Sequence, residues 1–102
     1  MPEHAVIVRF DYGSTDLSAL FELEDELERA IASANAGEYD GNEIAVDGSD
    51  GFLYMYGPSA DALFAAVKQT LADSSSIRNV VATLRYGPPA DDTKRVEIRV
   101  SN

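Results

Sequence analysis

Apolar residues follow two different spacings along this chain, and the order of these spacings constrains the fold more than any other feature. Five short segments alternate apolar and polar residues or are rich in β-branched and aromatic residues, which is typical of β-strands. Two longer segments repeat apolar residues every three to four positions, which is typical of amphipathic helices. The sequence therefore predicts the order βαββαββ. The strands are expected at residues 5–10, 42–47, 52–56, 79–86 and 94–100, and the helices at 16–34 and 60–71.

A Tyr-Gly pair ends three of the expected strands, at residues 12–13, 56–57 and 86–87. Glycine allows positive φ where a chain reverses, which gives the repeat a physical reason. The first two pairs lead into helices, so the chain has two strand-helix units of one kind. This architecture resembles the ferredoxin-like sandwich, βαββαβ, in which two helices cover one face of an antiparallel sheet. We therefore expect one α+β domain over residues 1–102, ferredoxin-like, with an additional C-terminal β-strand.

Composition excludes several classes of function. The 102 residues are 45% hydrophobic, enough for a folded core, and include no cysteine, which excludes disulfides, thiolate metal sites and thiol nucleophiles. The first residues do not resemble a secretory signal and no apolar run is long enough to span a bilayer, so we expect a cytoplasmic protein. The chain has no phosphate-binding loop and no dinucleotide fingerprint, and we expect no cofactor.

The Asp- and Gly-rich segments at residues 40–43 and 47–51 do not fit the ligand spacing of calcium loops. Asp and Gly at such positions are typical of turns instead. The single histidine, His4, lies near the terminus, where we expect it to be mobile. We therefore predict no metal site and no histidine-assisted catalysis, and an enzyme is the less favoured interpretation.

The excess of negative charge is confined to one half of the chain. The net charge is −10, with 18 acidic and 8 basic residues, and residues 1–50 contain 13 of the acidic and 2 of the basic ones. Such a charge repels phosphate backbones and anionic lipid headgroups, so we predict neither a nucleic-acid nor a membrane partner. A solvated face that keeps a small protein in solution is the simplest interpretation.

An acidic binding surface is the functional interpretation of the same charge. Its centre is expected on the first helix, together with the hairpin at residues 40–50, and its partner would be a basic protein. Nuclease inhibitors and immunity-type proteins resemble this chain in charge and size. The predicted surface consists of Glu22, Asp25, Glu26 and Glu28.

A second predicted surface follows from strand alternation. Phe52, Tyr54 and Tyr56 fall on the sheet face that the helices do not cover, with Arg9 and Arg85 to either side. An exposed aromatic row of this kind favours a homodimer or, as the alternative function, a dimeric ligand-binding or enzymatic domain with a pocket on this face. The row would be covered instead if the last strand folded over it, and it would be buried if the face assignment were shifted by one residue. The residues expected beneath the helices are Val6, Val8, Phe10, Ile44, Val46, Leu53, Met55, Val80, Ala82 and Leu84.

The segment Gly51-Phe52-Leu53-Tyr54-Met55 is similar to the central-strand motif of RNA recognition domains, in which exposed aromatic residues stack on bases. The resemblance implies RNA binding. Asp50 stands where that motif has a basic residue, and Ile7 stands where the first strand would supply an aromatic one. Because counterion release would also be missing from a chain of charge −10, we predict that this face does not bind RNA.

Glu24 and Glu28 lie one turn apart on the flank of the first helix. Partly buried carboxylates can act as general acid or base when burial raises their pKa. A carboxylate on a helix flank is more commonly solvated or paired with an arginine, for which Arg9 and Arg85 are candidates. We therefore predict no catalytic residue.

Overall fold

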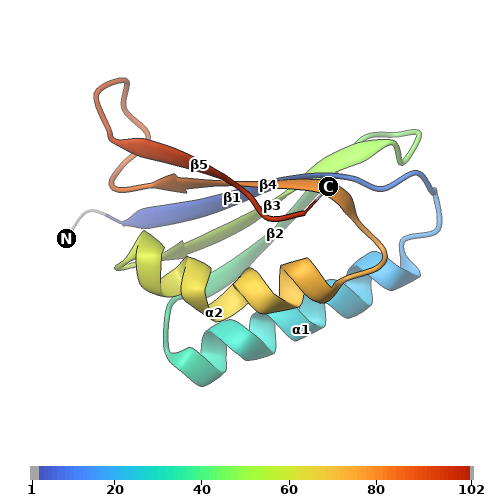
Figure 1. Cartoon of the computed structure of the whole chain (residues 1–102), viewed down its shortest axis with the longest axis horizontal. Coiled ribbons are helices and arrows are strands. Elements are labelled where there is room, and N and C mark those ends of the chain that lie inside the picture. Colours follow the sequence, from blue (N-terminus) through green and yellow to red (C-terminus); the bar gives the residue numbers. More distant parts are fainter. Residues whose placement is uncertain (1–2, 102) are drawn as a thin grey trace.

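The computed structural model describes residues 3–101 and contains five strands and two helices in the predicted order (Figure 1). The prediction of an α+β protein with a five-stranded antiparallel sheet and two helices is confirmed. The elements are β1 (His4–Asp11), α1 (Ser18–Ala34), β2 (Glu38–Ile44), β3 (Asp50–Gly57), α2 (Ala60–Asp73), β4 (Arg78–Arg85) and β5 (Arg95–Arg99).

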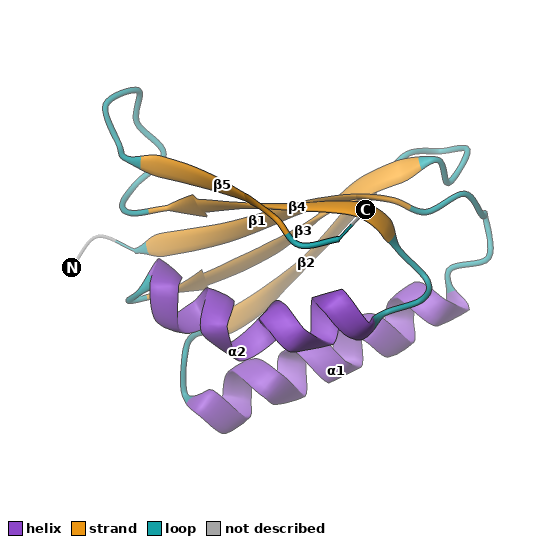
Figure 2. Ribbon diagram, in the orientation of Figure 1, coloured by secondary structure: helices purple, strands orange, loops and turns teal. Residues whose placement is uncertain are grey.

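The first strand lies in the middle of the sheet, whose order is β2-β3-β1-β4-β5. Ile7 of β1 pairs with Tyr54 of β3 on one side and with Thr83 of β4 on the other. Both helices lie on the same side of the sheet, and the fifth strand extends the sheet beside β4 (Figure 2). The last strand therefore does not cover the face opposite the helices, which we call the open face.

The hydrophobic core fills the layer between the sheet and the helices. Burial of apolar surface is the main stabilising term in folding, and strand alternation sends every second side chain of β1 into this layer. The residues predicted to lie beneath the helices are buried in β1, β3 and β4, as expected. The fully or almost fully buried side chains include Val6, Val8, Phe10, Leu20, Leu27, Ile31, Leu53, Met55, Leu63, Val67, Leu71, Val80, Ala82 and Leu84.

Val46 was predicted to lie beneath the helices, and this prediction is wrong. The second strand ends at Ile44, and a hydrogen bond from the Gly48 amide to the Ala45 carbonyl (2.8 Å) closes a turn that contains Val46. Its side chain is fully exposed there. The strand instead begins earlier than expected, at Glu38, because Tyr39 supplies the apolar contact with the core that Val46 was expected to provide.

The glycines of the three Tyr-Gly pairs differ in what the structure requires of them. Gly13 has φ of +89°, a conformation that favours glycine. Gly57 has no positive φ, but a side chain there would collide with the carbonyl oxygen of Ala36, because the loop after α1 passes directly over the end of β3. Gly87 has neither constraint. The interpretation that glycine serves chain reversal therefore holds for the first pair alone.

Among residues 3–101, neither helix is long and apolar enough to cross a membrane.

Two large apolar residues of α1 differ sharply in burial and give a matched test of this core. Leu27 is fully buried, whereas Phe21 is 54% exposed. We expect Leu27→Ala to lower the free energy of unfolding by about 2–5 kcal/mol, because it leaves a cavity between helix and sheet. Phe21→Ala should change it by less than about 0.5 kcal/mol. Urea unfolding followed by circular dichroism measures both, and similar losses for the two variants would contradict this packing.

Candidate interaction surfaces

The four acidic residues predicted on the first helix are all exposed on α1, and we call them the α1 acidic surface. Helical spacing distributes them around the outside of the helix. Glu22 and Glu26 face the neighbouring helix α2, whereas Glu28 lies on the opposite flank beside Tyr39. The surface therefore wraps around the helix rather than forming one flat patch.

A groove between α1 and the C-terminal end of α2 adds a carboxylate from α2 to this surface. It has a volume of about 370 Å³ and is lined by Glu22 and Glu26 from α1 and by Asp73 from α2. Most of its other walls are polar, with Gln69, Thr70 and three consecutive serines, 74–76. None of the ten residues that line it within the described chain is basic. A positively charged side chain placed here would meet three carboxylates and several hydroxyl groups.

Phe21 lies beside the acidic residues and was not predicted as part of the surface. It is 54% exposed and stands one helical turn before Asp25. Its position on the edge of the apolar arc made it resemble a core residue in the sequence. An exposed aromatic ring bordered by charge is typical of the residues that anchor protein interfaces.

Glu24 does not belong to this exposed surface, because it fastens α1 to the edge strand β2. Its carboxylate accepts a hydrogen bond from the Tyr39 hydroxyl (2.5 Å) and contacts Nδ2 of Asn42 with both oxygens (3.0 and 3.1 Å). The interpretation that an arginine would pair with this carboxylate is wrong. Burial and the hydrogen bond to Glu24 raise the pKa of Tyr39 well above its usual value.

The aromatic row predicted on the second surface is present on the open face. Phe52 is 37% exposed, Tyr54 and Tyr56 are half-buried, and the rings of Phe52 and Tyr54 stack with centroids 6.2 Å apart. The Tyr54 hydroxyl donates a hydrogen bond to the Glu43 carboxylate (2.6 Å), which raises the pKa of Tyr54 to about 12.

Arg9 and Arg85 share the open face with these aromatic residues, but the structure holds the two arginines apart. Arg9 pairs with Val81 across the sheet and Arg85 with Ala5, so they are four residues apart along the strands, about 13 Å. They therefore do not converge on one carboxylate or phosphate group.

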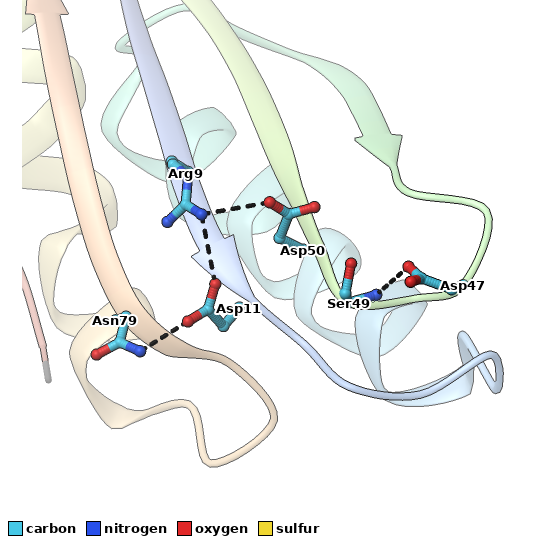
Figure 3. A network of polar contacts seen from close by, with 6 residues as sticks. All are labelled: Arg9, Asp11, Asp47, Ser49, Asp50 and Asn79. Atoms are coloured by element: carbon cyan, nitrogen blue, oxygen red, sulfur yellow. Dashed lines mark hydrogen bonds and ion pairs between the residues drawn. The ribbon is translucent and has the colours of Figure 1, made fainter.

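Each arginine also has partners of its own. Arg9 Nη2 lies 3.2 Å from Asp50 and 3.6 Å from Asp11, which in turn accepts a hydrogen bond from Asn79 (2.7 Å; Figure 3). Figure 3 also shows that the adjoining turn is held by a bond from the Ser49 amide to Asp47 (3.0 Å). Arg85 donates to the carbonyl of Gly87 (2.8 Å).

The described cavities lie away from the aromatic row of the open face. Two of them are lined by residues of the helices and of the loops near them, and the third also includes Glu38 and Tyr39 of β2. None of the three is lined by the aromatic row or by Arg9 or Arg85. A ligand pocket on the open face therefore stays a prediction.

His4 was expected to be mobile, but it is the first residue of β1 and contacts the start of α2. Its Nδ1 accepts a hydrogen bond from the Ala60 amide (3.0 Å), and its ring meets the edge of Tyr86 with centroids 5.7 Å apart. Together with Ser59, whose hydroxyl accepts from the Ala62 amide (3.2 Å), it satisfies the first free amides of the helix. This histidine has a structural role, and residues 3–101 contain no cluster of His, Asp and Glu that could hold a metal ion.

The bond between Tyr39 and Glu24 predicts a dependence of stability on pH. We expect Tyr39→Phe to lower the free energy of unfolding by about 1–3 kcal/mol at pH 7, because a hydrogen bond to a carboxylate is lost. The raised pKa of Tyr39 means that the folded protein keeps its proton after the unfolded chain begins to lose it near pH 10. Stability of the wild type should therefore fall as pH rises above 10, and the fall should be shallower in Tyr39→Phe.

Urea unfolding at intervals from pH 8 to pH 11.5 measures this slope, and Tyr56→Phe is the matched control because it leaves the Tyr39–Glu24 bond intact. An equally steep fall in the Tyr39→Phe and control variants would contradict the assignment.

Comparison of the chain with protein-family models, with curated proteins and with solved structures gave no match. The function is therefore inferred from the charges and contacts of the chain itself.

Proposed function

We propose that this protein is a non-catalytic protein-interaction module of the inhibitor or immunity type, and that its α1 acidic surface binds a basic protein partner. The observation that carries the proposal is the groove between α1 and α2. Glu22, Glu26 and Asp73 line it without a basic residue among the described lining. A lysine or arginine of a partner entering this groove would form charge-assisted hydrogen bonds with the three carboxylates.

The distribution of charge supports the same proposal at longer range. Of the 18 acidic residues, 13 lie in the first half of the chain, and α1 contains a large share of them. An acidic field around one helix accelerates encounter with a basic partner and disfavours acidic ones. Phe21 would supply the apolar contact that charge alone does not give, because desolvated aromatic side chains contribute much of the affinity at interfaces.

We also propose that the architecture is ferredoxin-like, with β5 as the additional C-terminal strand. Two features support this. The strands β1 and β3 lie side by side between β2 and β4, and both helices are on one side of the sheet. A structure determined by experiment, compared with other two-layer α+β proteins, would test this proposal.

Charge reversal in the groove tests the proposed function. At about 50 mM salt, the immobilised wild type should retain a basic protein from a cell extract. The double variant with Glu22→Lys and Glu26→Lys should retain at least tenfold less of that protein. The same partner should be released from the wild type as salt rises to about 300 mM. Quantitative mass spectrometry of the retained proteins measures both effects.

The matched control reverses two exposed carboxylates far from the groove, Asp91→Lys with Asp92→Lys in the loop before β5. This variant has the same net charge as the groove variant and should retain the partner. Equal retention by both variants, or no retained protein at low salt, would refute the proposed function. Circular dichroism of each variant confirms that the fold is intact.

A further inference from the structure

The open face has opposite charges at its two edges. Residues that pair across neighbouring strands point to the same face, so the register shows which side chains share it. The edge strand β2 contributes Glu38 and Glu43 to this face, through pairs with Tyr56 and Phe52. The other edge strand, β5, contributes Arg95 and Arg99, with Glu97 between them. The face is thus acidic along β2 and predominantly basic along β5.

The middle of the open face carries mainly apolar side chains. Ile7 on β1 pairs with Tyr54 on β3, and in the neighbouring row Phe52 on β3 and Val81 on β4 lie on either side of Arg9. We call Phe52, Tyr54, Ile7 and Val81 the apolar strip. Phe52 is 37% exposed and the other three side chains are half-buried, so the strip is accessible on a face that no helix covers. An accessible apolar strip between an acidic edge and a basic edge is complementary to a rotated copy of itself.

We propose that two copies of this chain form a symmetric dimer through their open faces, with the two-fold axis parallel to the strands and passing over β1. Rotation about this axis places the acidic β2 edge of each copy against the basic β5 edge of the other. An axis perpendicular to the strands would instead bring β2 against β2 and β5 against β5, which places like charges together. Charge therefore selects one of the two face-to-face arrangements.

The register identifies the pairs that this axis creates. Glu43, Phe52, Arg9, Val81 and Arg99 form one row across the sheet, so Glu43 comes opposite Arg99 of the second copy. By the same rule Glu38 comes opposite Arg95 of the second copy, and Ile7 meets its own equivalent on the axis. Sheets packed face to face lie about 10 Å apart with strands crossing at about 30°, offsets that Glu and Arg side chains can span.

Arg9 lies close to the axis and would meet its own equivalent. Its charge is more than neutralised by Asp50 at 3.2 Å and Asp11 at 3.6 Å, so the two guanidinium groups do not approach as unpaired cations. The five strands span about 24 Å, which places the contact at the small end of stable interfaces. We therefore expect a dissociation constant in the micromolar range that increases with salt.

Sedimentation equilibrium of the wild type tests the dimer directly. We expect a shift from monomer to dimer between about 1 µM and 1 mM protein at 50 mM salt. A strict monomer at 1 mM overturns the proposal. The variant with Glu22→Lys and Glu26→Lys should dimerise like the wild type, because α1 lies on the other side of the sheet. A failure of the proposed partner binding is therefore distinguishable from a failure of the dimer.

Charge exchange between the two edges tests the position of the axis. Glu43→Arg alone and Arg99→Glu alone should each raise the dissociation constant at least tenfold, because each places like charges together at two sites of the dimer. An equimolar mixture of the two variants should form a heterodimer as tightly as the wild type, because both sites then hold an Arg opposite a Glu. The double variant should also dimerise.

The mixture tests whether Glu43 of one copy lies opposite Arg99 of the other, as the proposed axis requires. If the single variants remain dimeric, or if the mixture stays monomeric, the proposed pairing of Glu43 with Arg99 is wrong. Tyr54→Phe serves as a further control, because Glu43→Arg also removes the hydrogen bond from Tyr54. Tyr54→Phe should dimerise within about threefold of the wild type, and loss of its dimer would show that the tyrosine bond, and not the charge pair, holds the copies together.

Discussion

The sheet depends on β1, which is hydrogen-bonded on both sides and fixes the face of every other strand. Val6, Val8 and Phe10 point into the core without exposure, so the alternate residues of β1 must point to the open face. The pairing of β1 with β3 then places the aromatic row on the open face, and the pairings of β1 with β4 and of β4 with β5 place Arg85, Arg95 and Arg99 there. One central strand thus separates two surfaces of different chemistry: an acidic helix on one side and an apolar strip with charged edges on the other.

Much of the fold could be predicted from periodicity because burial enforces it. The strands β1, β3 and β4 and both helices follow apolar patterns that only one set of faces satisfies. The second strand was placed too late, because it is an edge strand with a mostly polar sequence and its start depends on Tyr39 packing near Glu24. Val46 fits the alternation of a strand but lies in a turn. This turn is recognised only from the hydrogen bond between the Gly48 amide and the Ala45 carbonyl.

The residues that form the candidate surfaces could be predicted from the sequence, but the groups that these residues contact could not. The acidic residues of α1 are exposed as the helical pattern indicates, whereas the contribution of Asp73 to the groove depends on how α1 and α2 cross. Arg9 and Arg85 looked available in the sequence, yet Asp50 and the carbonyl of Gly87 occupy them. Asp50 is far from Arg9 in the sequence, and the partner of Arg85 is a backbone carbonyl. The spacing of apolar and charged residues along the chain indicates neither contact.

The central position of β1 also has a consequence for the order in which the chain can fold. Ile7 pairs with both Tyr54 and Thr83, so β1, the first of the five described strands along the chain, completes its pairing only after β3 and β4 are in place. Long-range pairing of this kind slows folding, because the loops must close before the contacts compensate for the lost entropy. During synthesis β1 remains an unpaired apolar strand until β3 has left the ribosome, and in that interval the nascent chain is exposed to aggregation.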